Sequence, residues 1–90
     1  MVLITNVHMS PPGRGHEHIA EVAWRNPDDG KTGQSTVAEM VDFIEKKNGK
    51  ATVTDGRNTA DVGVVDATPK HIRSHADGVW TDNLLALPRY

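Results

Sequence analysis

Hydrophobic residues recur at every second position over several short stretches of the chain, which is the period of a half-buried β-strand. The pattern predicts strands over residues 2–9, 16–25, 50–54 and 59–67. Residues 70–75 form a fifth candidate strand, and its alternating basic residues suit an exposed or edge position. Proline, glycine, asparagine and aspartate between these stretches favour loops and tight turns.

The alternation also predicts which side chains face the core. In the second stretch it places Val22 and Trp24 on one face and Ile19 on the opposite, charged face. The two stretches on either side of residues 55–58 form a hairpin, because the sequence Asp-Gly-Arg-Asn favours a tight reversal. The side chains that this hairpin directs inward are Val53, Val62 and Val64.

A helix is predicted in the middle of the chain. Thr36 and Glu39 have the spacing of a capping box, in which each side chain accepts a hydrogen bond from the other residue's backbone amide. The apolar positions that follow recur at i, i+3, i+4 and i+7 and form a buried stripe of Val37, Met40, Val41 and Ile44. Lys46 and Lys47 suit the helix C-terminus, where Gly49 can adopt the left-handed conformation that ends a helix.

Together these elements predict an α+β fold in the order ββαβββ. We expect a predominantly antiparallel sheet of four to five strands, with one helix packed on one face. The 90 residues suit a single domain, and 37% hydrophobic with 24% charged residues is a globular composition. The prediction is therefore one domain over residues 1–90, with residues 76–90 as a C-terminal tail packed on it.

The tail contains much apolar surface without the periodicity of a strand or a helix. Its apolar side chains include Trp80, Leu84, Leu85 and Leu87. So much apolar surface needs a partner, either within the domain or outside it. We expect Trp80 to dock against the sheet, and the competing hypothesis is a tail that binds a protein partner.

Charge and cysteine content narrow the function classes. The net charge of −2 creates no strong field toward nucleic acid or anionic membranes. The absence of cysteine excludes disulfides and thiolate chemistry. No apolar stretch is long enough to cross a bilayer, and the N-terminal apolar run is too short for a signal peptide. We expect a cytoplasmic protein that does not bind membranes.

Five histidines raise the question of a metal site. His16 and His18 would share one strand face and His71 and His75 another, so four imidazoles could meet if those strands were close. The closely spaced ligand pairs of structural zinc sites are missing, so we expect no metal and no other cofactor. Potential acid/base carboxylates also show no sign of convergence on a catalytic site, and they are Glu17, Glu21, Asp55 and Asp61.

Basic residues of the fifth candidate strand could form a strip that binds a single-stranded nucleic acid. Lys70 and Arg73 lie there with two histidines, and Arg57 lies nearby in sequence. Such binding also needs stacking aromatics, so Trp80 would have to share a face with the strip. Otherwise these residues belong to a solvated edge strand.

Three segments resemble a bacterial family of small uncharacterised proteins, the domain of unknown function thirty-eight ninety-two. They are His16-Glu17-His18-Ile19, the helix start at residues 35–41, and the closing motif at residues 77–88. The likeness covers nearly the whole chain, and the closing motif is long enough to be fairly specific. The resemblance implies no substrate and no catalytic residues.

The sequence thus favours a small non-catalytic binding or adaptor module that presents a sheet edge or its apolar tail to a protein partner. The alternative is a weak single-stranded nucleic-acid binder, and the third class is a metal-dependent enzyme. We expect a monomer or a weak homodimer formed through a sheet edge.

Overall fold

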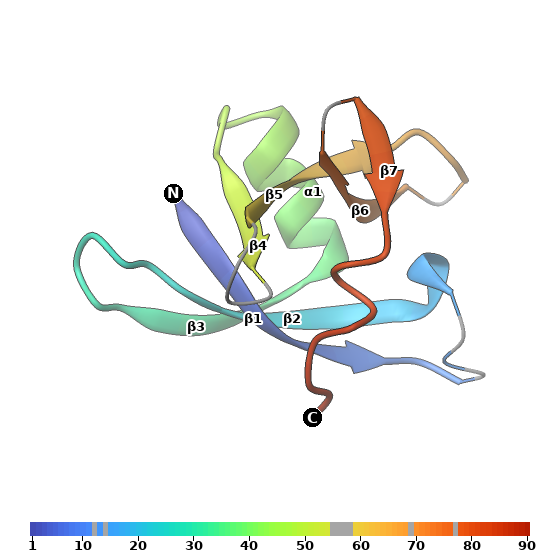
Figure 1. Cartoon of the computed structure of the whole chain (residues 1–90), viewed down its shortest axis with the longest axis horizontal. Helices are drawn as coiled ribbons and strands as arrows, with labels where there is room; N and C mark the ends of the chain where they lie inside the picture. Colours follow the sequence, from blue (N-terminus) through green and yellow to red (C-terminus); the bar gives the residue numbers. More distant parts are fainter. Residues whose placement is uncertain (12, 14, 55–58, 69, 77) are drawn as a thin grey trace.

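The structure is a computed structural model that describes residues 1–11, 13, 15–54, 59–68, 70–76 and 78–90. Within these residues one α-helix and seven strands form an α+β fold (Figure 1). The strands are β1 (Val2–Met9), β2 (Ile19–Arg25), β3 (Thr32–Thr36), β4 (Ala51–Thr54), β5 (Thr59–Val65), β6 (His71–Ala76) and β7 (Val79–Thr81). The helix is α1 (Val37–Glu45), and a short 3-10 helix, η1 (His16–His18), precedes β2.

The strands form one mixed, mostly antiparallel sheet in the order β3-β2-β1-β4-β5-β6-β7. β1 and β4 are parallel neighbours, and every other adjacent pair is antiparallel. The helix contacts β2 and β3 toward one end of the sheet and β5 and β6 toward the other, so the sheet curves around it. The α+β class and the helix on one face are confirmed.

The predicted count of four to five strands is wrong, because the described part of the chain contains seven. The sequence of β3 is Thr-Gly-Gln-Ser-Thr, which has no large apolar side chain and therefore no hydrophobic alternation. β7 has only three residues, too few to show a period. Both are edge strands, where a polar or short sequence is tolerated because one side has no strand to pair with.

Two β-bulges explain why the buried positions of β1 and β2 depart from strict alternation. The register of the two strands shifts between Ile4 and Asn6 and again between His8 and Met9. A bulge inserts one residue and so moves the side chains beyond it to the other face. As a result Ile19 is buried on the same side as Val22, and its predicted place on the charged face is wrong. The predicted strand over 16–25 also begins later, because its first three residues form η1.

The helix begins as predicted. The Thr36 Oγ1 accepts a hydrogen bond from the Glu39 amide at 3.1 Å, and Glu39 Oε1 accepts one from the Thr36 amide at 2.9 Å. The left-handed residue after the helix is Asn48, with φ of 52°, rather than Gly49. Gly49 has a different role, because a Cβ there would lie 2.3 Å from the ring of Phe43.

The core lies between the helix and the curved sheet, and the C-terminal tail closes it. Buried side chains from both layers form it: Val2, Ile4, Val7, Ile19, Val22, Val37, Met40, Val41, Ala51, Val53, Ala60, Val62, Ile72 and Leu84. In Figure 1 the tail runs from β7 to β1, where the Val7 amide donates to Pro88 O at 3.1 Å. The Tyr90 amide donates in turn to Val7 O at 3.2 Å. The predicted turn at residues 55–58 lies outside the described residues.

Candidate interaction surface

The side chains of β6 alternate between the core and the outer face of the sheet. Ile72 and Ser74 are fully buried, so His71, Arg73 and His75 lie on the face away from the helix. Trp80 of β7 is the register partner of His75 and therefore lies on this face too. Arg73 and Trp80 therefore lie on the same face of the sheet, which is the arrangement that nucleic-acid binding would require.

An indole ring forms the centre of this surface. The Trp80 ring meets the His75 ring edge-on, with 5.5 Å between centroids and an interplanar angle of 83°. On β5, Gly63 lies next to both rings, since a Cβ there would lie 3.2 Å from His75 Cδ2 and 3.5 Å from Trp80 Cη2. We call the group of Gly63, Arg73, His75 and Trp80 the β6–β7 face.

Trp80 is part of strand β7 and contacts the His75 ring, but it does not belong to the core. It is 44% exposed, and its neighbour Val79 is 65% exposed. The two side chains alternate about β7, so they flank its outer edge from opposite faces. That edge has no partner strand among the described residues.

The leucines of the tail pack in or against the hydrophobic core. Leu84 is fully buried, and Leu85 and Leu87 pack against the core. The Ser74 hydroxyl fixes the start of this segment, because it accepts a hydrogen bond from the Asn83 amide at 3.1 Å and lies 2.7 Å from Thr81 Oγ1. Of the three tail leucines, Leu84 therefore offers no surface to a partner, and Leu85 and Leu87 are only partly accessible.

The predicted basic strip is divided between two sides of the molecule. Lys70 Nζ lies 2.9 Å from Glu45 Oε1 on the helix, and this carboxylate raises the pKa of Lys70. Arg73 remains at the outer face, where its Nη2 lies 2.9 Å from Asp82 Oδ1 and its Nε donates to Thr81 O at 3.1 Å. Both cations are thus paired with carboxylates. Arg57 lies outside the described residues.

The four candidate histidines lie in different surroundings. His16 is buried, with Nε2 3.9 Å from Asp82 Oδ1, and His71 is near enough to affect its pKa. His18 Nδ1 accepts a hydrogen bond from the Gly15 amide at 3.2 Å. His75 contacts Trp80, and His71 lies at the start of β6. Across the described ranges, no three His, Cys, Asp or Glu side chains are arranged to hold a metal ion.

Burial lowers the pKa of His16, and the positive charge of Arg73 lowers it further. The carboxylate of Asp82 acts in the opposite direction and His71 in the same direction as Arg73. The lowered pKa favours the neutral form of the imidazole. Its Nε2 is buried and has no hydrogen-bond partner among the residues that the structure describes.

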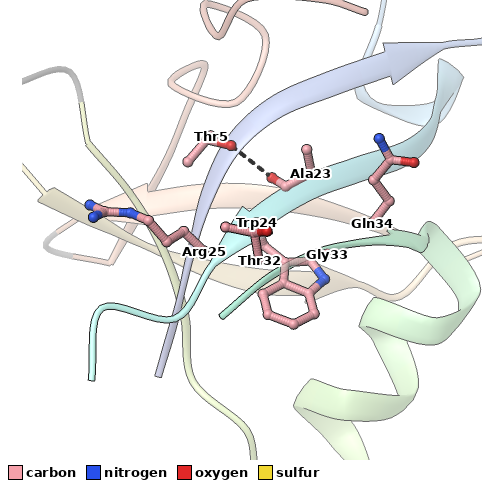
Figure 2. Close-up of a pocket in the computed structure, with 7 residues that line it drawn as sticks. All are labelled: Thr5, Ala23, Trp24, Arg25, Thr32, Gly33 and Gln34. Carbon is pink, nitrogen blue, oxygen red and sulfur yellow. Dashed lines mark hydrogen bonds between the residues drawn. The ribbon is translucent and has the colours of Figure 1, made fainter. Parts of the chain in front are cut away.

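A shallow depression on the outer face of β1, β2 and β3 was missed by the sequence analysis (Figure 2). Its volume is about 580 Å³, and Thr5, Arg25, Thr32 and Gln34 line it. Figure 2 shows that these polar side chains do not converge on one point. The Trp24 indole points to the opposite face of the sheet, toward the helix. The depression depends on β3, and the absence of a hydrophobic signal for that strand explains why it was missed.

In the part of the chain that the structure describes, no helix has the length and apolar character needed to cross a membrane.

The fold and its surface define a class: a small α+β domain with a curved, mostly antiparallel sheet and an exposed aromatic residue on an edge strand. The chain belongs to the family described as Protein of unknown function (DUF3892), whose model matches residues 3–88. This match confirms the resemblance found in the three sequence motifs. Searches of curated proteins and of solved structures give no significant match to this chain.

Proposed function

We propose that this protein is a small non-catalytic binding module that recognises a protein partner through β7. The observation that carries the proposal is the pair of large apolar side chains, Val79 and Trp80, that flank the edge of this strand where no described strand pairs with it. Tryptophan is among the residues most enriched at energetically important positions of protein interfaces. An extended peptide that added a strand to this edge would hydrogen-bond with the β7 backbone and cover both side chains.

The surroundings of Trp80 support this interpretation. The indole is held edge-on against His75 and over Gly63, so a partner would meet a ring whose orientation is already set. A preset side chain loses less conformational entropy on binding than a mobile one. The edge also supports the proposal that the protein is a monomer or a weak homodimer, because three residues offer few backbone hydrogen bonds.

Affinity capture with matched variants tests the proposal. A partner retained by the wild-type chain from a bacterial lysate is identified, purified and titrated against the wild type and against Trp80→Ala and Val79→Asp. Tyr90→Ala is the control, because Tyr90 has a similar exposure of 43% but lies at the end of the tail. Both β7 variants should bind at least about tenfold more weakly, as expected for an interface hot spot, while the control binds normally. Equal binding by all variants would rule out β7 as the recognition surface.

A single-stranded nucleic acid is the second candidate, because Arg73, His75 and Trp80 share the β6–β7 face. Stacking of a base on the indole and contact of a phosphate with the guanidinium would use that arrangement. Two observations argue against nucleic-acid binding: Arg73 is paired with Asp82, and the net charge of the chain is −2. Titration with an oligothymidylate distinguishes the two candidates, since nucleic-acid binding should weaken steeply with added salt and protein binding through β7 should not.

A further inference from the structure

A second hollow lies on the opposite side of the sheet, between the helix and the β2–β3 hairpin. Its volume is about 370 Å³, which is within the usual range of small-molecule sites. Apolar side chains from three elements form its inner surface, and they are Val2, Trp24, Met40 and Phe43. We call it the α1–β3 cleft. It shares no lining residue with the β6–β7 face.

The two aromatic rings of the cleft are held in place by the surrounding structure. Trp24 Nε1 donates a hydrogen bond to Ser35 Oγ at 3.1 Å, which satisfies the polar atom of the indole. Gly33 makes room for this ring, since a Cβ there would lie 2.6 Å from Trp24 Cζ2. Gly49 makes room for the ring of Phe43 in the same way, as described above. The apolar surface of the cleft is therefore formed before any ligand binds.

Charged side chains at the cleft have an excess of positive charge. Lys31 and Lys47 both line it, and neither forms an ion pair with another described residue. By contrast, Lys46 lies 3.5 Å from Asp42 and does not line the cleft. Glu39 also lines the cleft, but its carboxylate accepts the hydrogen bond from the Thr36 amide. Two lysines and one glutamate give the cleft a local charge of +1 in a chain whose net charge is −2.

An apolar interior lined also by two ammonium groups that pair with no described carboxylate matches one class of ligand. We propose that the α1–β3 cleft binds a small molecule with an apolar body and a single carboxylate, such as a medium-chain or aryl-alkyl carboxylic acid. The apolar body would lie against Trp24, Met40 and Phe43, and the carboxylate would lie between Lys31 and Lys47. A dicarboxylate would fit less well, because its second charge would be placed either in the apolar interior or near Glu39.

Tryptophan fluorescence can test this proposal directly. The variant Trp80→Phe leaves Trp24 as the reporter, since these are the two tryptophans of the chain. Octanoate is titrated into this variant, with octanol as the uncharged probe of similar length and succinate as the dicarboxylate. Octanoate should change the Trp24 emission and saturate, octanol should bind more weakly, and succinate should not bind. No response to octanoate at millimolar concentration would overturn the proposal, as would equal binding of octanol.

Lysine variants in the same background test the position of the carboxylate. Lys31→Gln and Lys47→Gln should each weaken octanoate binding by about two- to fivefold, the range for a partly exposed charge pair. Lys46→Gln is the matched control, because it removes the same charge from the adjacent residue outside the cleft. Octanol binding should be unchanged in all three variants. An equal effect of the Lys46 and Lys47 substitutions would show that only overall charge matters and would contradict the proposed site. These titrations do not involve β7, so their failure leaves the proposed protein-binding function intact.

Discussion

The imidazole of His16 lies beside the carboxylate of Asp82, with 3.9 Å between Nε2 and Oδ1, yet the two groups are not hydrogen-bonded. Asp82 instead forms its short contact with Arg73, at 2.9 Å. The His16 side chain is 8% exposed, whereas that of Asp82 is 74% exposed. The carboxylate therefore keeps much of its water and does too little to favour a protonated imidazole in this buried position.

This arrangement predicts that the protein loses stability as the pH falls below about 6.5, the ordinary pKa of histidine. The folded pKa of His16 is lowered, so the unfolded chain takes up a proton before the folded protein does. The contribution of neutral His16 to stability is thus fully present above about pH 6.5. It is lost as the pH falls from there through the folded pKa. The charged and titratable groups around the imidazole are Arg73, Asp82, His71 and Glu17.

Urea unfolding of wild type and His16→Gln between pH 7.5 and pH 5 measures this effect. The difference in unfolding free energy between the two proteins should shift in favour of the variant as the pH falls. His75→Gln is the control, because that ring lies on the outer face of the sheet against Trp80. A parallel pH dependence in wild type and His16→Gln would show that His16 does not determine the acid sensitivity.

The capping box predicts a specific loss of stability at the helix start. Thr36→Ala removes the oxygen that accepts the Glu39 amide hydrogen bond and should cost about 1 kcal/mol. Lys46→Ala removes an exposed ion pair with Asp42. It should lower the free energy of unfolding by at most a few tenths of a kcal/mol, as is usual for such a pair. Chemical denaturation of both variants tests the comparison. Equal losses would mean that the capping interaction contributes little here.

The elements predicted correctly from the sequence are those whose signals are local. The helix start depends on two side chains three residues apart, and the first strand has the expected bounds of Val2–Met9. β3 and β7 were missed because their pairing, not their own composition, makes them strands. The burial of Ile19 was missed because a bulge is defined by the register of two strands.

The same distinction applies to the candidate sites. The sequence indicated that Trp80 and Arg73 were interaction candidates, but it could not show that Arg73 is paired with Asp82 or that Lys70 faces the helix. The α1–β3 cleft depends on the place of Gly33 opposite Trp24, which is set by the β2–β3 register. A glycine in a polar segment has no visible packing role in the sequence alone.

Gly33→Ala should therefore disturb the cleft. The new methyl group would lie 2.6 Å from Trp24 Cζ2, so the indole must move and its hydrogen bond to Ser35 is strained. Overpacking of this kind typically costs about 1–3 kcal/mol, which exceeds the gain from a less flexible unfolded chain. Gly63→Ala is the milder comparison, because its methyl group would lie 3.2 Å from the His75 ring at the surface. The melting temperatures of the two variants test whether Gly33→Ala is the more destabilising, and Trp24 emission in a Trp80→Phe background reports on the indole. A Gly33→Ala protein with an unchanged melting temperature and unchanged Trp24 emission would contradict the prediction.

The last prediction concerns the tail, in which Leu84 rather than Trp80 is the main stabilising residue. Leu84 is fully buried, while Trp80 remains 44% exposed despite its contact with His75. Leu84→Ala would leave a cavity in the core and should cost about 3–5 kcal/mol, a large part of the stability of so small a domain. Trp80→Ala gives up only partial burial and should cost about 1–2 kcal/mol. Because the Leu84→Ala chain could be unfolded, Leu84→Val provides a smaller cavity whose effect remains measurable by urea denaturation. A Trp80→Ala protein less stable than Leu84→Ala would reverse this order and place the tail's contribution at the β6–β7 face instead of the core.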